Sequence, residues 1–322
     1  MKEVSPMNKK ILVLALSFIL LLSGCSVDIK QNDKAIYEAL KREVYKKDDT
    51  SIHELIKEYK EIAKSDNEPY ILVKFIDENI KNVDKKEAVA MILILEEVQK
   101  EYTSRYTDEL FADNNQAELL SLSQDQLFFD ETKVEEIKNA DLKELVNKIL
   151  NGKYKLMNLE GAFYPVIDYE GLKSYSSYLT DEMKDYLEIK SNSSNMPVVI
   201  DGEMTISHEE LGQRLIETEK YISKYPNSIK AQDALRCYGE CLKVYLEGTP
   251  NTPIYDAKTG KIKDEVISSY MKLSSNKDLV TSQVISRYIE IIQGNQNIID
   301  DNVLSHVPEV YSSAIASLEN ME

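Results

Sequence analysis

The segment Ile52-His53-Glu54-Leu55-Ile56-Lys57-Glu58-Tyr59-Lys60-Glu61-Ile62-Ala63 carries its apolar residues at spacings of three and four. An α-helix has ~3.6 residues per turn, so this spacing places those residues on one face. The segment therefore predicts an amphipathic helix with one buried side. The chain of 322 residues has only 10 glycines and 8 prolines. This is too few for the many turns of an all-β fold, so we expect helices elsewhere too.

Further helices follow from signals at their ends. Pro69 is placed to open a helix, since proline is tolerated in the first turn. Asp84 can cap a long helix whose apolar run 88–95 predicts a central, heavily covered element. Asp141 can cap another helix, with Gly152 just after its end.

The middle of the chain contains the strongest candidate linker and a small turn. Residues 191–197 are polar and end in proline, as is typical of a linker between domains. Asp201-Gly202 lies between short apolar runs and predicts a small β-hairpin. Ser207 and Glu210 then form a capping-box pattern for the next helix.

A repeat-like motif follows that helix. It consists of Tyr221-Ile222-Ser223-Lys224-Tyr225-Pro226-Asn227-Ser228 and then Ala231, Ala234, Leu235, Gly239 and Glu240. The motif resembles the tetratricopeptide-like (TPR-like) repeats of bacterial envelope lipoproteins over about residues 211–247. In such repeats one helix ends in this turn, and small residues let the next helix pack closely against it. Helices expected at 263–275, 279–293 and 308–319 could stack on this unit, although they do not repeat the motif. We therefore predict an all-α fold, either a helix-pair bundle or a short TPR-like solenoid, with at most a small β-hairpin.

The N-terminus carries a targeting pattern. Lys9 and Lys10 precede the apolar run 11–22, which ends in Leu22-Ser23-Gly24-Cys25. Residues 11–24 would span ~21 Å as a helix, whereas a membrane core measures ~30 Å. The pattern resembles a bacterial lipoprotein signal peptide with its lipobox. The resemblance implies cleavage after residue 24 and acylation of Cys25 with diacylglycerol and palmitate. It places the protein on the extracytoplasmic face of the cell membrane, or at the outer membrane if the host has one.

These signals divide the chain into a signal peptide (1–24), a polar tether (25–32), an N-terminal helical domain (33–190) and a C-terminal TPR-like helical domain (198–322). The formal net charge of −17 argues against nucleic acid as a partner, because phosphates require clustered Lys and Arg. It also argues against a membrane-binding surface patch, which leaves the lipid on Cys25 as the expected membrane contact.

Little in the sequence predicts catalysis, a cofactor or a metal site. The chain has three histidines, His53, His208 and His306, and they are far apart. Cys237 and Cys241 share one helix face and could be a metal or redox pair, but buried small hydrophobic residues are the favoured interpretation. We expect a protein that is not an enzyme.

The region 160–178 is the strongest candidate for a small-molecule site. It combines tyrosines with carboxylates: Tyr164, Tyr169, Tyr175 and Tyr178 with Glu160, Asp168 and Glu170. Flat aromatic faces bind sugars, and paired carboxylates could cleave a cell-wall glycan. The alternative is that the tyrosines pack between helices and the carboxylates cap turns, which we favour.

Two functions follow. The first is a non-catalytic interaction or scaffold module that binds an envelope protein, with Tyr225 and Tyr238 on its helical surface. The second is a glycan-binding or glycan-cleaving lipoprotein that uses Tyr164, Asp168 and Tyr169. We favour the first, since helix-pair repeats usually present surfaces to protein partners.

Overall fold

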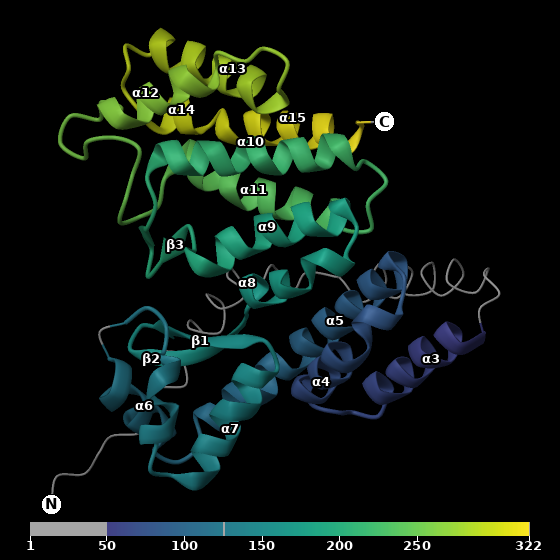
Figure 1. Ribbon diagram of the computed structural model, residues 1–322. Coiled ribbons are helices and arrows are strands. Elements are labelled where there is room, and N and C mark those ends of the chain that lie inside the picture. The colour runs from purple at the N-terminus through teal and green to yellow at the C-terminus, as the bar shows by residue number, and fades with distance from the viewer. Residues whose placement is uncertain (1–49, 125, 322) are drawn as a thin grey trace, which may run out of the picture.

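The computed structural model describes residues 50–124 and 126–321, with the side chains of 50–53 excepted. These residues form 13 α-helices and two short antiparallel strand pairs, which confirms the predicted all-α fold. Figure 1 shows helices α3 to α7 and hairpin β1–β2 in one half of the molecule and α9 to α15 in the other. The signal peptide (1–24), Cys25 and the tether (25–32) lie outside the described residues.

The first half is built around one long central helix. Its helices are α3 (Thr50–Lys64), α4 (Pro69–Asn79), η1 (Ile80–Asn82), α5 (Lys85–Leu110), α6 (Asn115–Ser123), η2 (Glu131–Glu136) and α7 (Ala140–Asn151). Helices α3, α4 and α7 all pack against α5, and the run 88–95 of α5 is largely buried. Asp84 and Glu87 form a full capping box at its start, as the sequence predicts for Asp84.

The cap of α7 differs from the prediction by two residues. Helix α7 starts at Ala140, and the Asn139 side chain accepts hydrogen bonds from the backbone N–H groups of Asp141 and Leu142. Asp141 is therefore inside the first turn, where its negative charge still favours the helix N-terminus. Gly152 follows the helix end as predicted.

A β-hairpin that is not predicted from the sequence follows α7. Strand β1 (Tyr154–Leu159) pairs with β2 (Ala162–Ile167) across a turn in which Glu160 has φ 50° and Gly161 φ 79°. Two successive residues with positive φ are typical of a type I′ hairpin turn. One face of the hairpin joins the main core, and the other belongs to a second, smaller apolar cluster.

The segment predicted as a linker is mostly helix. The elements here are α8 (Tyr169–Leu172), η3 (Lys173–Tyr178), α9 (Asp181–Asn195), β3 (Val199–Ile200) and β4 (Glu203–Met204). Helix α9 continues to Asn195 because its polar residues are satisfied within it: buried Ser191 donates to the carbonyl of Glu188. The small hairpin at Asp201-Gly202 is confirmed.

The second half is a bundle of helix pairs. It contains α10 (His208–Lys224), α11 (Ala231–Glu247), α12 (Asp264–Leu273), α13 (Val280–Gly294), α14 (Asp301–Leu304) and α15 (Val307–Glu319). Helix α10 packs against α11 and α12, and Gly239 of α11 gives Tyr311 of α15 a close approach. Because α15 packs on both α11 and α13, these helices close into a bundle rather than continuing as an open solenoid.

Both halves share one hydrophobic core, which extends from Ile56 in α3 to Leu318 in α15. The division at 190/198 into two domains stays a prediction. Among the described helices, none is both long enough and apolar enough to cross a membrane.

Candidate functional site

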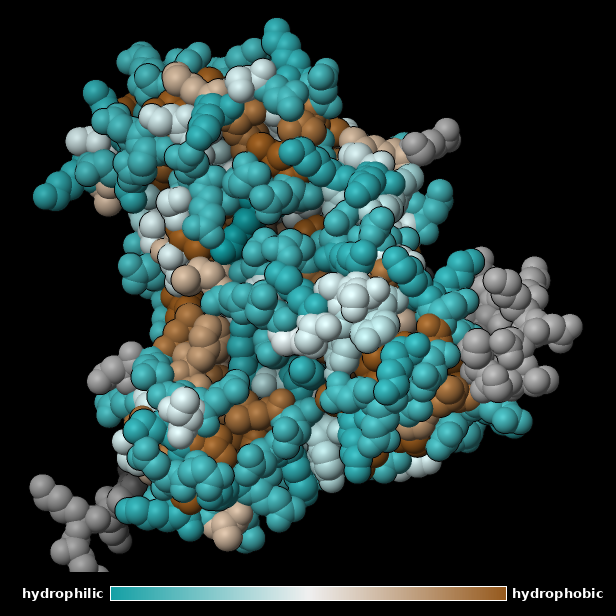
Figure 2. All heavy atoms as spheres, in the orientation of Figure 1, coloured by the Kyte–Doolittle hydropathy of each residue, from teal (hydrophilic) through white to brown (hydrophobic). Residues whose placement is uncertain are grey.

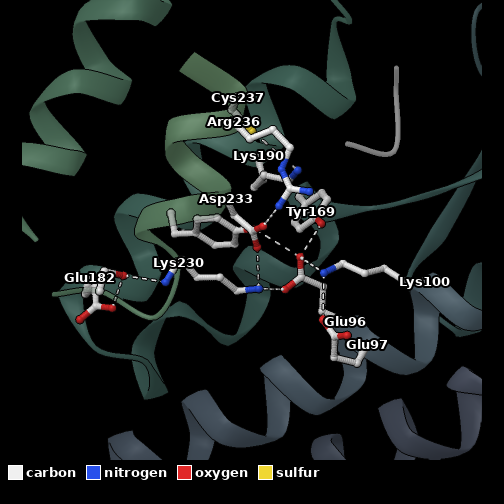
Figure 3. A network of polar contacts seen from close by, with 12 residues as sticks. Glu96, Glu97, Lys100, Tyr169, Glu182, Lys190, Lys230, Asp233, Arg236 and Cys237 are labelled. Carbon is white, nitrogen blue, oxygen red and sulfur yellow. Dashed lines mark hydrogen bonds and ion pairs between the residues drawn. The ribbon is translucent and has the colours of Figure 1, made fainter. Parts of the chain in front are cut away.

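A buried network of charged residues lies where the two halves meet (Figure 3). Glu96 of α5 is only 1% exposed. Its Oε2 accepts a hydrogen bond from Lys230 Nζ at 2.5 Å. Its Oε1 accepts from the hydroxyl of Tyr169 at 2.7 Å and from that of Tyr186 at 3.2 Å.

Lys230 is the matching buried cation. It is 6% exposed and lies in the loop between α10 and α11. Its ammonium also donates to Asp233 Oδ2 at 3.1 Å and lies 5.1 Å from the centre of the Tyr186 ring. Asp233 forms a second ion pair with Arg236, one helical turn further along α11.

The network joins elements that are far apart in the sequence. Glu96 and Lys230 are separated by 134 residues, and Tyr169 and Tyr186 come from α8 and α9. A buried charge without a partner would destabilise the fold strongly, so the two halves are held in the arrangement that keeps the charges paired.

The protonation states of the network follow from its geometry. Burial alone would raise the pKa of Glu96, but the positive charges of Lys230 and Lys100 more than offset burial and hold it well below its usual range. Burial alone would lower the pKa of Lys230, but Glu96 and Asp233 reverse this and raise it. At neutral pH the acid is ionised and the base is protonated, so neither is poised for proton transfer.

The two cysteines of α11 lie beside this network. Cys237 Sγ is 4.0 Å from Lys190 Nζ, and both cysteines are half-buried. Burial raises the pKa of Cys237 and raises that of Cys241 to about 12. Both are therefore thiols rather than reactive thiolates at neutral pH. In the part of the chain that the structure describes, no three His, Cys, Asp or Glu residues are placed to hold a metal ion.

Three of the tyrosines predicted as binding residues are buried. Tyr164 on β2 packs against Phe111, with ring centroids 5.1 Å apart. Tyr169 belongs to the ion-pair network, and Tyr238 is completely buried with its hydroxyl 2.9 Å from that of Thr281. For Tyr164 and Tyr169 this placement agrees with the interpretation that the tyrosines of 160–178 pack between elements. Tyr238, expected on the helical surface, lies in the core instead, because it is on the face of α11 that packs against neighbouring helices.

The remaining predicted residues are more accessible but are not brought together. Asp168 is half-buried just before α8, and half-buried Tyr225 donates to Asp185 Oδ2 at 2.9 Å. Glu160 lies at the turn of the hairpin, whereas Asp168 follows the far end of β2. A strand of that length spans roughly 20 Å, while glycosidase carboxylates are about 5 to 9.5 Å apart. Glu160 and Asp168 therefore do not form such a pair.

Neither Glu96 nor Lys230 is predicted from the sequence as a functional residue. One signal was present: Glu96 directly follows the apolar run 88–95 in a helix predicted to be covered on most sides. A charge at such a position requires a buried partner. Nothing in the sequence indicates that Lys230, so distant along the chain, is that partner.

No protein-family model matches this chain, and no curated protein or solved structure matches it either.

Proposed function

We propose that this protein is a lipid-anchored, non-catalytic interaction or scaffold module on the extracytoplasmic face of the cell envelope. The observation that carries the proposal is the architecture: a helix-pair bundle whose position against the first half is fixed by the buried pair Glu96–Lys230. A rigid helical body of this kind offers a preformed surface to a partner, which lowers the entropic cost of binding.

The chemistry of the buried network supports a non-catalytic role. A general base at neutral pH needs a pKa near 7 and access to its substrate. Glu96 and Lys230 have neither, because each holds the other in its charged form and both are buried. The network is better suited to holding helices together than to moving protons.

The lipobox pattern supports the proposed location on the extracytoplasmic face of the cell envelope. Lipid on Cys25 would anchor the protein stably, because two acyl chains suffice where one is marginal. The partner would then be an envelope protein within reach of the anchored domain. The net charge of −17 supports a protein partner over nucleic acid.

Crosslinking in cells, followed by mass spectrometry of what is captured, tests the proposal. The full, lipid-anchored chain should yield a specific protein partner, and Cys25→Ala should abolish capture because the protein is released or stays unprocessed. Normal membrane retention of a mature-sized Cys25→Ala protein would contradict the anchor. Retention on isolated cell wall without any protein partner would instead favour the glycan-binding alternative at 160–178.

A further inference from the structure

The face of hairpin β1–β2 that points away from the main core is apolar except for Lys155. Met157 and Leu159 of β1 and Ala162, Tyr164 and Val166 of β2 alternate with the residues that face the core. In a surface hairpin the second face is usually polar, because it meets water. Here it forms an apolar cluster that is separate from the main core.

The three central residues of this cluster, Met157, Leu159 and Tyr164, are buried, and only the residues around them reach the surface. Leu127, Phe128 and Ile200 pack over them, but all three are half-buried, as are Ala162 and Val166. We call these five residues the hairpin patch. Figure 2 shows hydrophobic surface on the narrowed left side of the molecule, over the elements β1, β2 and β3 of Figure 1. The patch thus lies where the two halves approach each other.

The charges around the hairpin patch are mainly negative. Glu160, at the hairpin turn, and Asp201 and Glu203, next to Ile200, are all exposed. One cation, Lys155, lies on the same face of the hairpin as Met157 and Leu159: its Nζ donates to Asn195 Oδ1 at 2.6 Å and lies 4.4 Å from the centre of the Phe128 ring. The patch therefore presents apolar surface with an acidic rim.

The edges of the hairpin are not available for strand addition. The Gln116 side chain occupies the outer edge of β2, where it accepts from Phe163 N–H at 2.7 Å and donates to Phe163 C=O at 2.9 Å. Pro165 has no N–H to offer. On β1, the Leu156 carbonyl accepts from Phe129 N–H at 2.8 Å. A partner would bind the face of the hairpin rather than extend the sheet.

We infer that the hairpin patch is the surface that binds the partner, and that the partner contributes a segment with apolar side chains flanked by Lys or Arg. This inference rests on the proposed function and narrows it to one surface. A basic amphipathic helix has this chemistry, since its apolar side would cover the patch and its cations would meet the acidic rim.

The test uses the full chain anchored in phosphatidylcholine nanodiscs, with empty nanodiscs as the blank. The probes are a short fluorescent amphipathic helix of leucine and lysine and its counterpart of leucine and glutamate. The leucine–lysine peptide should bind saturably, and the leucine–glutamate peptide should not. Val166→Lys should weaken binding at least about tenfold, because it places a charge in the apolar contact.

Met271→Lys is the matched control. Met271, on α12 in the other half, is the most exposed large apolar residue among those described, at 52%, so the same change there should leave binding unchanged. Equal losses in Val166→Lys and Met271→Lys, or equal binding of the two peptides, would overturn the inference.

A second variant keeps the test valid if Val166→Lys does not fold. Glu160→Asn with Glu203→Gln changes exposed residues only, and asparagine tolerates the positive φ of position 160. It should weaken binding and flatten its salt dependence, and an unchanged salt dependence would contradict the acidic rim.

Photo-crosslinking in cells separates this inference from the proposed function. A partner captured from other surfaces, but not from position 166, would leave the proposed function standing and reject the hairpin patch. No partner from any position would reject the proposed function itself.

Discussion

Glu96, between the two halves, and Glu219, inside the second half, are both 1% exposed, but different groups stabilise them. Glu96 faces the ammonium of Lys230, from a distant part of the chain. Glu219 of α10 accepts hydrogen bonds from the backbone N–H groups of Val280, at 2.6 Å, and Thr281, at 2.9 Å. Glu219 thus caps the N-terminus of α13, whose own preceding residue supplies no side-chain cap.

The difference lies in what each carboxylate requires of its partner. Backbone N–H groups at a helix start are neutral, and they remain hydrogen-bond donors whatever happens to Glu219. Lys230 and Glu96 are both buried charges, so removing either one leaves the charge of the other buried without this partner. We therefore expect the contact between the halves to be more sensitive to single substitutions than the interior of the bundle.

Lys230→Met should have the largest effect. It leaves the Glu96 charge buried, which typically costs about 3 to 5 kcal/mol of unfolding free energy. Lys100 remains 3.8 Å from Glu96, so the loss should be near the lower end of that range. Urea denaturation followed by circular dichroism measures it.

The double variant Glu96→Leu with Lys230→Met is its control. With both charges removed, most of the lost stability should return, because apolar residues often replace a buried ion pair without penalty. A double variant as unstable as Lys230→Met would show that packing, rather than unpaired charge, explains the loss.

His208 is a third buried titratable group. Unlike Glu96 and Glu219, it is paired neither with an opposite charge nor with backbone N–H groups. Its Nε2 has no hydrogen-bond partner, and its ring stacks on Tyr245 at 4.4 Å. Burial lowers its pKa from 6.5 to about 4. The folded state thus favours neutral His208, and its contribution to stability is present above pH 6.5 and lost as the pH falls towards 4.

His208→Phe should remove that pH dependence while keeping the stacked ring. The stability difference between wild type and variant should shift in favour of the variant below pH 6.5, by at most about 3 kcal/mol in total. Denaturation curves at several pH values test this. A difference that does not change with pH would mean that His208 is not held neutral.

Glu219→Gln tests the helix cap. The amide NH₂ would face backbone donors, leaving at least one of them unpaired, so we expect a loss of about 2 to 3 kcal/mol. The loss should be smaller than for Lys230→Met, and hydrogen exchange should speed up first at the start of α13. A larger loss than that of Lys230→Met would reverse the comparison.

Local signals predicted most of the helices because they act within one turn. Asp84 and Ser207 cap helices α5 and α10 as predicted, and Asp201-Gly202 forms its small hairpin. The larger hairpin is not predicted, because its sequence mixes glycine, proline, aromatic residues and carboxylates without a clear strand pattern. Pro165 fits within β2 because it lies at a position whose N–H is not needed for pairing with β1.

The buried networks could not be predicted because their partners meet only through the tertiary fold. Helical periodicity indicates that α5 is covered, but it does not indicate which residue faces Glu96. The same limit explains Tyr169, predicted as a binding residue from its aromatic chemistry, and Tyr238, predicted as one on the surface of the repeat-like helices. The fold buries both: one hydroxyl bonds Glu96, and the other bonds Thr281.

Tyr169 and Tyr238 allow a direct comparison of the two networks, since the same substitution, Tyr to Phe, can be made in each. Tyr169→Phe removes a hydrogen bond to a carboxylate and should cost about 1.5 kcal/mol or slightly more, because bonds to charged groups are the stronger ones. Tyr238→Phe removes a bond to the Thr281 hydroxyl and should cost about 1 kcal/mol. Paired denaturation curves measure the difference. If Tyr238→Phe were the costlier change, charge would not be what distinguishes the two networks, and the greater sensitivity expected at the contact between the halves would have to come from packing.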